Sequence, residues 1–396
     1  RRDCLPRSRF TRGLRVSEPR ATNDLLPLDS LAYALGKPQG SAIIKQEFSD
    51  FRVDEELAFA PSGEGDHVFI QIQKTDASTI EVAKRLSDVA AVRQADVSYS
   101  GMKDRRGETS QWFSVKLPPE KEPRLAALED EKLAIIAMHR NSRKLKIGSH
   151  ARNRFQLKLR GCEGSRDDFE RRLEALRDGG VPNYFGAQRF GAQMSNLRQV
   201  SVLMRQVLEG DEAVQQGGRF RRGMLYSAAR SYLFNQVLSE RISAGNWQSY
   251  LRGDVLSLDG SGRCFKLADE EAGEEWTDEL QQRIETLDIH TTGPLPGIIS
   301  AKDKYVSSGE AADIEKRVLT ELDWMVAGLE AFGLQASRRA LRFAAAELNW
   351  QWEQEIPARI SSSDAEACGN LNLAFTLPRG AYATSLLREL CQLRES

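Results

Sequence analysis

Hydrophobic and polar residues alternate in short runs through much of the first 160 residues. The segments SAIIKQEFSDFRVDEEL (41–57) and DHVFIQIQKT (66–75) alternate in this way and are divided by the turn-rich sequence PSGEGD. Because successive side chains of a β-strand point to opposite faces, this alternation predicts strands in both segments. The segments QWFSVKL (111–117) and RFQLKLR (154–160) alternate too and are expected to be strands.

Hydrophobic residues at helical spacing predict helices in other parts of the chain. In DASTIEVAKRLSDVAAV (76–92) the hydrophobic residues share one face, and Ser78 and Glu81 have the spacing of a capping box. The same reasoning predicts a helix that ends at glycine in SRDDFERRLEALRDGG (165–180) and a long helix across MLYSAARSYLFNQVLSERI (224–242).

The order of these patterns suggests that one domain is inserted into another. After Leu341–Phe343 the chain becomes strand-like again in NLAFTLPRG (372–380), and it closes on a predicted helix, YATSLLRELCQL (382–393). Strands and helices at both ends therefore flank a helix-rich middle, so we expect an α+β (mixed α/β) fold. Residues 1–40 are rich in arginine and are expected to form a loop-like leader.

Composition narrows the class of protein. The 396 residues suffice for two domains, and no run of eighteen hydrophobic residues predicts a membrane span. The five cysteines and four histidines are scattered. We therefore expect no disulfide framework, no metal site and a reducing cytoplasmic location.

The charge is distributed unevenly, although the formal net charge is only −1. Residues 139–160 contain no acid but eight basic residues: Arg140, Arg143, Lys144, Lys146, Arg152, Arg154, Lys158 and Arg160. In the predicted strand within this window, Phe155, Leu157 and Leu159 share one face and the basic residues share the other. The basic window is either a solvated strand face or a binding surface for the phosphates of a nucleic acid.

Two further segments contain residues suited to chemistry. NYFGAQRFG (183–191) combines aromatic rings, glycines, an amide and a cation, which fits either an RNA contact or a turn with an aromatic cluster. In SYSGMKDRRGETSQWFSV (98–115), Asp104 lies between Lys103 and two arginines, so we expect its carboxylate to be ionised. An ionised carboxylate can act as a nucleophile, but a surface turn with ion pairs explains the same residues.

Four motifs, in this order, give the chain a resemblance to a known family: GMKDRRGETSQWFSV, NYFGAQRFG, RSYLFNQVLSERI and LPRGAYATSLLREL. Together they resemble the TruD family of tRNA pseudouridine synthases, from about Ile43 to the C-terminus. The resemblance implies a catalytic domain with a mixed sheet, formed by residues 41–178 and 344–396. It also implies a family-specific inserted α/β domain, residues 179–343, with an RNA-binding cleft between the two.

The resemblance implies that the protein isomerises uridine to pseudouridine in tRNA, at position 13, without a cofactor. Asp104 matches the aspartate that performs the chemistry, and Lys45 matches a lysine that pairs with it. Phe51, Asn153, Phe155 and Tyr382 match residues that bind the target base. Two positions depart from the family pattern, because Tyr382 is often phenylalanine and Ala187 stands where glutamate is common.

The expected partner is tRNA, bound by a monomer that needs no membrane and no other protein. The residues that we expect to contact RNA are cations of the three regions above: Lys103, Arg105, Arg143, Lys144, Arg152 and Arg189. A non-catalytic RNA-binding or tRNA-folding protein with the same fold is the alternative. The intact set of matching residues speaks against it, and no DxD pattern supports a phosphatase.

Overall fold

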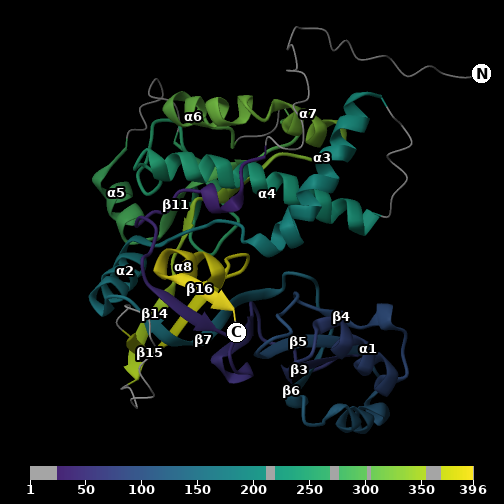
Figure 1. Ribbon diagram of the computed structural model, residues 1–396. Coiled ribbons are helices and arrows are strands. Elements are labelled where there is room, and N and C mark those ends of the chain that lie inside the picture. The colour runs from purple at the N-terminus through teal and green to yellow at the C-terminus, as the bar shows by residue number, and fades with distance from the viewer. Residues whose placement is uncertain (1–24, 211–218, 268–275, 301–304, 354–366, 396) are drawn as a thin grey trace, which may run out of the picture.

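The computed structural model describes residues 25–210, 219–267, 276–300, 305–353 and 367–395. Within these residues the largest element is a ten-stranded mixed sheet, in the lower part of Figure 1. Its strands are β1 (Ser41–Ile44), β2 (Phe51–Leu57), β3 (His67–Thr75), β4 (Ser98–Tyr99), β5 (Glu108–Lys116), β6 (Leu133–Asn141), β7 (His150–Glu163), β14 (Ala346–Glu353), β15 (Ala367–Pro378) and β16 (Gln392–Glu395).

The central path of this sheet runs in the order β14-β15-β7-β2-β5-β3-β6. The pairs β2–β5 and β1–β16 are parallel, and the other pairs are antiparallel. The predicted α+β fold with a mixed sheet is therefore confirmed. The predicted strands are also present, and in β7 Phe155, Leu157 and Leu159 are buried as their alternation indicated.

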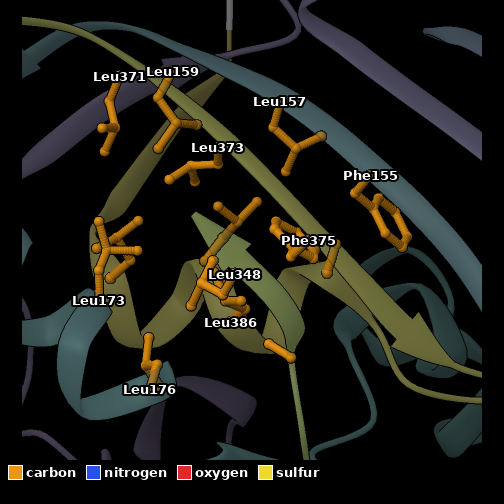
Figure 2. Close-up of a cluster of buried hydrophobic side chains, with 14 of the residues drawn as sticks. Phe155, Leu157, Leu159, Leu173, Leu176, Leu348, Leu371, Leu373, Phe375 and Leu386 are labelled. Atoms are coloured by element: carbon orange, nitrogen blue, oxygen red, sulfur yellow. The ribbon is translucent and has the colours of Figure 1, made fainter. Parts of the chain in front are cut away.

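Three helices cover the hydrophobic side chains of the sheet: α1 (Thr79–Ala90), α2 (Arg166–Gly179) and α8 (Ala383–Leu390). Helix α1 begins with the predicted capping box between Ser78 and Glu81 and packs on β3 and β5. Helices α2 and α8 pack on β7 and β15, and Figure 2 shows the leucines of both helices facing the Leu and Phe side chains of these strands. This core fixes the strands from which the candidate site is built.

The segment between α2 and β14 forms a second group of elements, in the upper part of Figure 1. It contains β8 (Val181–Pro182), α3 (Ser195–Leu208), α4 (Arg219–Ser243), β9 (Val255–Leu258), β10 (Cys264–Lys266), α5 (Asp278–Glu285), β11 (Ile289–Leu295), α6 (Gly309–Thr320), α7 (Asp323–Ala331), β12 (Ser337–Ala340) and β13 (Arg342–Phe343).

The two ends of this segment meet, because β8 pairs with β13. Between them β10-β9-β11-β12 form a separate sheet, and the buried face of α4 packs against α3 and α7. Within the described residues, the segment gives no strand to the ten-stranded sheet. The division into domains at residues 178/179 and 343/344 stays a prediction.

The two ends of the chain differ in how far they match expectation. Residues 25–40 contain one short 3-10 turn, Leu28–Ser30, and Leu31 is buried in the core around α4; the rest of the leader, residues 1–24, lies outside the described residues. The closing helix was expected to reach residue 393, but it ends at Leu390. The reason is a tertiary contact, because β16 pairs with β1 and requires an extended backbone from Cys391 onward.

Candidate active site

Asp104 lies in the loop that joins β4 to β5, with a side chain that is 42% exposed. The Nζ of Lys45 is 2.9 Å from its Oδ2 atom, and the same ammonium lies 3.9 Å from the centre of the Phe51 ring. Lys45 follows β1 directly and has a left-handed backbone, with φ 58°. Lys45 therefore contacts both the carboxylate, as the resemblance implied, and the ring of Phe51, which the sequence did not predict.

The backbone of Asp104 is held separately by Lys74, the inward-facing lysine at the end of β3. The Lys74 Nζ donates to the carbonyl oxygens of Asp104, at 2.6 Å, and of Ala77, at 2.7 Å. Lys74 is fully buried, and burial lowers its pKa to about 8 despite the nearby charge of Asp104. Neither of these bonds uses the carboxylate, so the side chain of Asp104 stays accessible while its backbone is fixed.

The rest of the loop is fixed against the start of α1. The backbone N–H of Lys103 donates to Thr79 Oγ1, at 3.0 Å, and this hydroxyl donates to Gln111 Oε1, at 2.8 Å. Gln111 in turn donates to the carbonyl of Gly101, at 3.0 Å. Arg105 pairs with Asp76 at 3.0 Å and keeps an exposed side chain. The loop is thus positioned by backbone contacts at several of its residues.

Lys103 does not fit its predicted role as an RNA contact. Its side chain is only 8% exposed, and its Nζ lies 2.7 Å from Oε2 of the fully buried Glu55. Glu55 also accepts a hydrogen bond from the backbone N–H of Trp112, at 3.1 Å. The residues around Lys103 in the sequence do not show that this carboxylate lies below the loop, and a lysine engaged in a buried ion pair presents no charge to RNA.

Phe51 and Phe155 come from the neighbouring strands β2 and β7, and both are buried. Their rings meet edge to face with centroids 6.2 Å apart, and Phe155 also stacks on Phe375 at 5.2 Å. Asn153 lies opposite Glu55 in the same strand pair. Its buried Oδ1 atom has no hydrogen-bond partner in the structure. A buried acceptor without a donor is costly, so this atom is suited to receive an N–H from a ligand.

Tyr382 and Arg189 belong to a different cluster. Tyr382 precedes α8 and packs on Phe185, with centroids 6.1 Å apart. The guanidinium groups of Arg189 and Arg339 lie 5.4 Å and 4.1 Å from the centre of the same ring. The segment 183–191 thus forms a turn with an aromatic cluster, its role as an RNA contact stays a prediction, and the described contacts do not connect Tyr382 or Arg189 with Asp104.

A cleft of about 580 Å³ separates the ten-stranded sheet from the second group of elements. Its lining includes residues 148–151, 378, 379 and 381 on one side and residues 257–262, 338–340, 342 and 343 on the other. Asp104 does not line the cleft, but His150 does, and its Nδ1 is 2.7 Å from Ser100 Oγ in the loop of Asp104. Burial, with the nearby cation of Lys103, lowers the pKa of His150 to about 4, so its ring is neutral at physiological pH.

The basic window is less basic in the fold than in the sequence. Five of its cations pair with acids from other segments: Arg140 with Glu122, Arg152 and Arg154 with Glu56, Lys158 with Glu353, and Arg160 with Asp50. Arg143, Lys144 and Lys146 are exposed in the turn between β6 and β7 and make no ion pair with the described residues. Arg152 remains half exposed beside Glu56, at 2.7 Å.

Sequence reasoning missed Lys74 and Glu55, although the alternation contained a signal for both. Lys74 has the same parity as the buried Ile70 and Ile72 of β3, and Glu55 has the same parity as the buried Phe51 and Val53 of β2. A charged residue at an inward position of a strand must be paired or bonded.

The described part of the chain contains no cluster of three or more His, Cys, Asp or Glu side chains that could hold a metal ion. None of its helices has the length and hydrophobicity of a membrane span.

Comparisons with known proteins give a consistent result. The family model of tRNA pseudouridine synthase D (TruD) matches residues 28–216 and 206–390. A tRNA pseudouridine synthase D of Nitrosococcus oceani is 41% identical over 367 residues, which cover 92% of this chain and 95% of that protein. The protein of the same name from Methylococcus capsulatus is 40% identical over 364 residues, with 92% and 95% covered.

A solved structure from Methanosarcina mazei, assigned as a tRNA pseudouridine synthase D, has the same fold. It matches with a TM-score of 0.66 over 91% of this chain and 95% of that one, at 20% identity.

Proposed function

Since the chain belongs to the TruD family of tRNA pseudouridine synthases, we propose that it isomerises uridine 13 of tRNA to pseudouridine with Asp104 as the catalytic carboxylate. Membership makes the protein an isomerase. The carboxylate, the position in the tRNA and the absence of a cofactor are the proposed parts. The observation that best supports the role of Asp104 is its half-exposed carboxylate, 2.9 Å from Lys45, on a loop held by buried Lys74.

The proposed reaction breaks the bond between ribose C1′ and N1 of uracil and forms a bond between C1′ and C5. The hydrogen on C5 leaves as a proton and N1 takes up a proton, so the reaction is an isomerisation that transfers no electrons and requires no redox cofactor. Asp104 acts on the sugar, either by attack on C1′ or by removal of the 2′ proton. Both routes use the carboxylate as a base or nucleophile, and the ammonium of Lys45 lies 2.9 Å from it.

The uracil would be held by the residues around Phe51 and Asn153. A base that reacts in this way must leave its stack, and aromatic rings can replace the lost contacts. Phe51 and Phe155 supply such rings, and the unpaired Oδ1 of Asn153 can accept the N3–H of uracil. Tyr382 joins the pocket in this proposal through closure of the cleft over the base, since its present contacts are with Phe185.

We place the tRNA along the cleft and the turn between β6 and β7. The proposed phosphate contacts are the exposed or partly exposed cations of the predicted set: Arg105, Arg143, Lys144, Arg152 and Arg189. A single chain acts without a protein partner in this proposal, in the cytoplasm, where tRNA is modified.

The decisive test is tritium release from tRNA labelled at uridine C5, in the presence of EDTA. The wild-type protein should release tritium, and Asp104→Asn should release none while it binds tRNA within a few-fold of wild type, because the amide preserves the shape. Asp66→Asn is the matched control, since Asp66 is also ion-paired, with Lys116 at 3.0 Å, but lies elsewhere. It should react like wild type.

Three outcomes would contradict the proposal. Tritium release by Asp104→Asn at the wild-type rate would exclude Asp104 as the catalytic group. Undiminished release from a tRNA with cytidine at position 13 would place the target elsewhere. A wild-type protein that binds tRNAs but releases no tritium would favour the alternative, an RNA-binding protein without this activity.

A further inference from the structure

Two hydrophobic side chains project into solvent close to Asp104. Ile147 is 83% exposed and Met102 is 62% exposed, more than any other large hydrophobic side chain in the described residues. Ile147 lies in the turn between β6 and β7, and Met102 lies two residues before Asp104. Single exposed hydrophobic residues are common on protein surfaces. The two most exposed ones, beside one catalytic loop, require a more specific explanation.

The turn and the loop of Asp104 are joined to each other. The backbone N–H of Gly148 donates to the carbonyl of Ser100, at 2.6 Å, and the ring of His150 bonds the hydroxyl of the same serine. Ile147 therefore directly precedes Gly148 in the turn between β6 and β7, and Met102 lies two residues after Ser100 in the loop between β4 and β5. Both side chains flank one point of the surface, next to the catalytic carboxylate.

Ile147 is held outward by a rigid turn. The hydroxyl of Ser149 donates to the carbonyl of Lys146, at 2.7 Å, and the backbone N–H of Ser149 donates to the same carbonyl, at 3.1 Å. On the N-terminal side, the buried Leu145 donates its N–H to Ser114 Oγ in β5, at 2.9 Å. On the C-terminal side, the guanidinium of Arg379 donates to the carbonyl of Gly148. The position of Ile147 is thus fixed by neighbours on both sides.

The surroundings of Ile147 are positively charged. Arg143, Lys144 and Lys146 precede it in the chain and are exposed. Arg379, at the edge of the cleft, contacts the next residue, Gly148. A hydrocarbon side chain surrounded by cations suits a nucleic acid, because the cations can contact phosphates while the side chain enters the base stack. Neither an apolar protein surface nor the interior of a membrane would compensate these charges.

We propose that Ile147, with Met102 beside it, inserts into the RNA at the target uridine and occupies the space that the flipped base leaves. This inference rests on the proposed function, because only an enzyme that acts on a base must remove it from the stack. The inserted side chain opposes the return of the base while Asp104 reacts. Ile147 is therefore a positioning residue for the substrate.

The test compares Ile147→Ala with Ile147→Leu and with a matched control, Ile136→Ala. Ile136 is also exposed, at 50%, but lies on β6 at the edge of the sheet. We expect Ile147→Ala to lower kcat/KM for tritium release from tRNA by about tenfold, because it removes three methyl or methylene groups from contact with the bases. Ile147→Leu should stay within about twofold of wild type, and Ile136→Ala should equal it.

A second readout reports the stack directly. The tRNA carries 2-aminopurine next to the target uridine, and the proteins carry Asp104→Asn so that no turnover occurs. Binding should increase the fluorescence of 2-aminopurine, because its stacking neighbour leaves, and adding Ile147→Ala should remove most of this increase. A merely structural role of Ile147 would leave the fluorescence change intact.

The outcomes separate the two claims. If the wild-type protein releases no tritium, the proposed function fails and the inference that rests on it fails too. If the wild type reacts and Ile147→Ala matches it in both rate and fluorescence change, only the inference is overturned. A side chain this exposed contributes little to the stability of the fold, and equal circular dichroism spectra of the variants would confirm their folded state.

Discussion

At the scale of single residues, two lysines hold Asp104 by different atoms. Lys45 binds the carboxylate, whereas Lys74 binds the backbone carbonyl from the buried side. The division has a chemical advantage, because the group that fixes the loop does not compete with the substrate for the carboxylate. A buried ammonium normally loses its proton more easily than an exposed one, and the lowered pKa of Lys74 reflects this burial.

Replacement of Lys74 by methionine should therefore impair the reaction without removing any group that touches the substrate. The carbonyls of Asp104 and Ala77 would lose their donor, which costs about 1–3 kcal/mol for a buried group, and the loop would lose its fixed position. We expect kcat to fall about tenfold or more, which single-turnover tritium release would measure. The affinity for tRNA should change little. Lys116→Met, which removes an exposed ion-paired lysine, is the control.

The pH dependence of kcat provides a second check on the role of Lys74. The pKa of Lys74 is about 8, so the side chain is protonated below pH 8 and loses its positive charge as the pH rises through this value. Wild-type kcat should decline above pH 8 as the charge-assisted bonds weaken, and Lys74→Met should lack this decline. A variant with the wild-type rate and the wild-type pH profile would contradict the positioning role.

The residues of the site were only partly predictable from the sequence. The pairing of Lys45 with Asp104 was expected from the family resemblance, and the structure brings these two residues together. Phe51 and Phe155 were expected to bind the target base, which stays a prediction; the structure places their rings edge to face. Lys103 was misjudged because its partner, Glu55, lies about fifty positions away in the chain. Pairing across such a separation depends on the register of strands, which local patterns do not encode.

At the scale of elements, the parallel pair β2–β5 places the end of the loop of Asp104 against Phe51. Gly107 precedes β5 and has a φ of 156°, and a Cβ atom at this position would lie 2.6 Å from the Phe51 carbonyl oxygen and 3.0 Å from its ring. The close approach requires glycine. It also couples the start of β5 to the ring that we assign to the target base.

Gly107→Ala should consequently destabilise the protein and displace Phe51. We expect a loss of about 1–3 kcal/mol, typical of overpacking, seen as a lower urea midpoint, and slower tritium release from the protein that remains folded. Gly63→Ala is the control, since Gly63 also has a positive φ, 82°, but its Cβ would meet no atom within 4 Å. Equal midpoints for the two variants would show that the contact with Phe51 is unimportant for stability.

Elements with a strong local pattern were the ones that the sequence predicted well. Helix α1 has its capping box, and β7 has its alternation of buried and exposed residues. The strand β16 was missed because Gln392–Glu395 form it only by pairing with β1, at the other end of the chain. The preceding hydrophobic pattern continues the helix, and a tertiary contact overrides it.

At the scale of the whole molecule, the fold redistributes charge that the sequence places together. Five of the eight cations of residues 139–160 pair with acids of other segments, although Arg152 and Arg154 share Glu56 and stay about half exposed. The exposed cations without an acidic partner in the described residues lie together in the turn of Arg143, Lys144 and Lys146. This turn also carries Ile147 and joins the loop of Asp104, so the exposed positive charge is concentrated beside that loop.

The salt dependence of tRNA binding distinguishes these two groups of cations. Each phosphate contact releases counterions, so the loss of one contact should flatten the plot of log affinity against log salt by roughly one unit. Lys144→Ala should weaken binding and flatten this plot, because Lys144 has no acidic partner in the described residues. Lys158→Ala should change the slope little, because Lys158 is already paired with Glu353 at 2.7 Å. If Lys158→Ala flattens the plot and Lys144→Ala does not, the RNA crosses the open face of the sheet, and the turn of residues 143–147 lies outside its path.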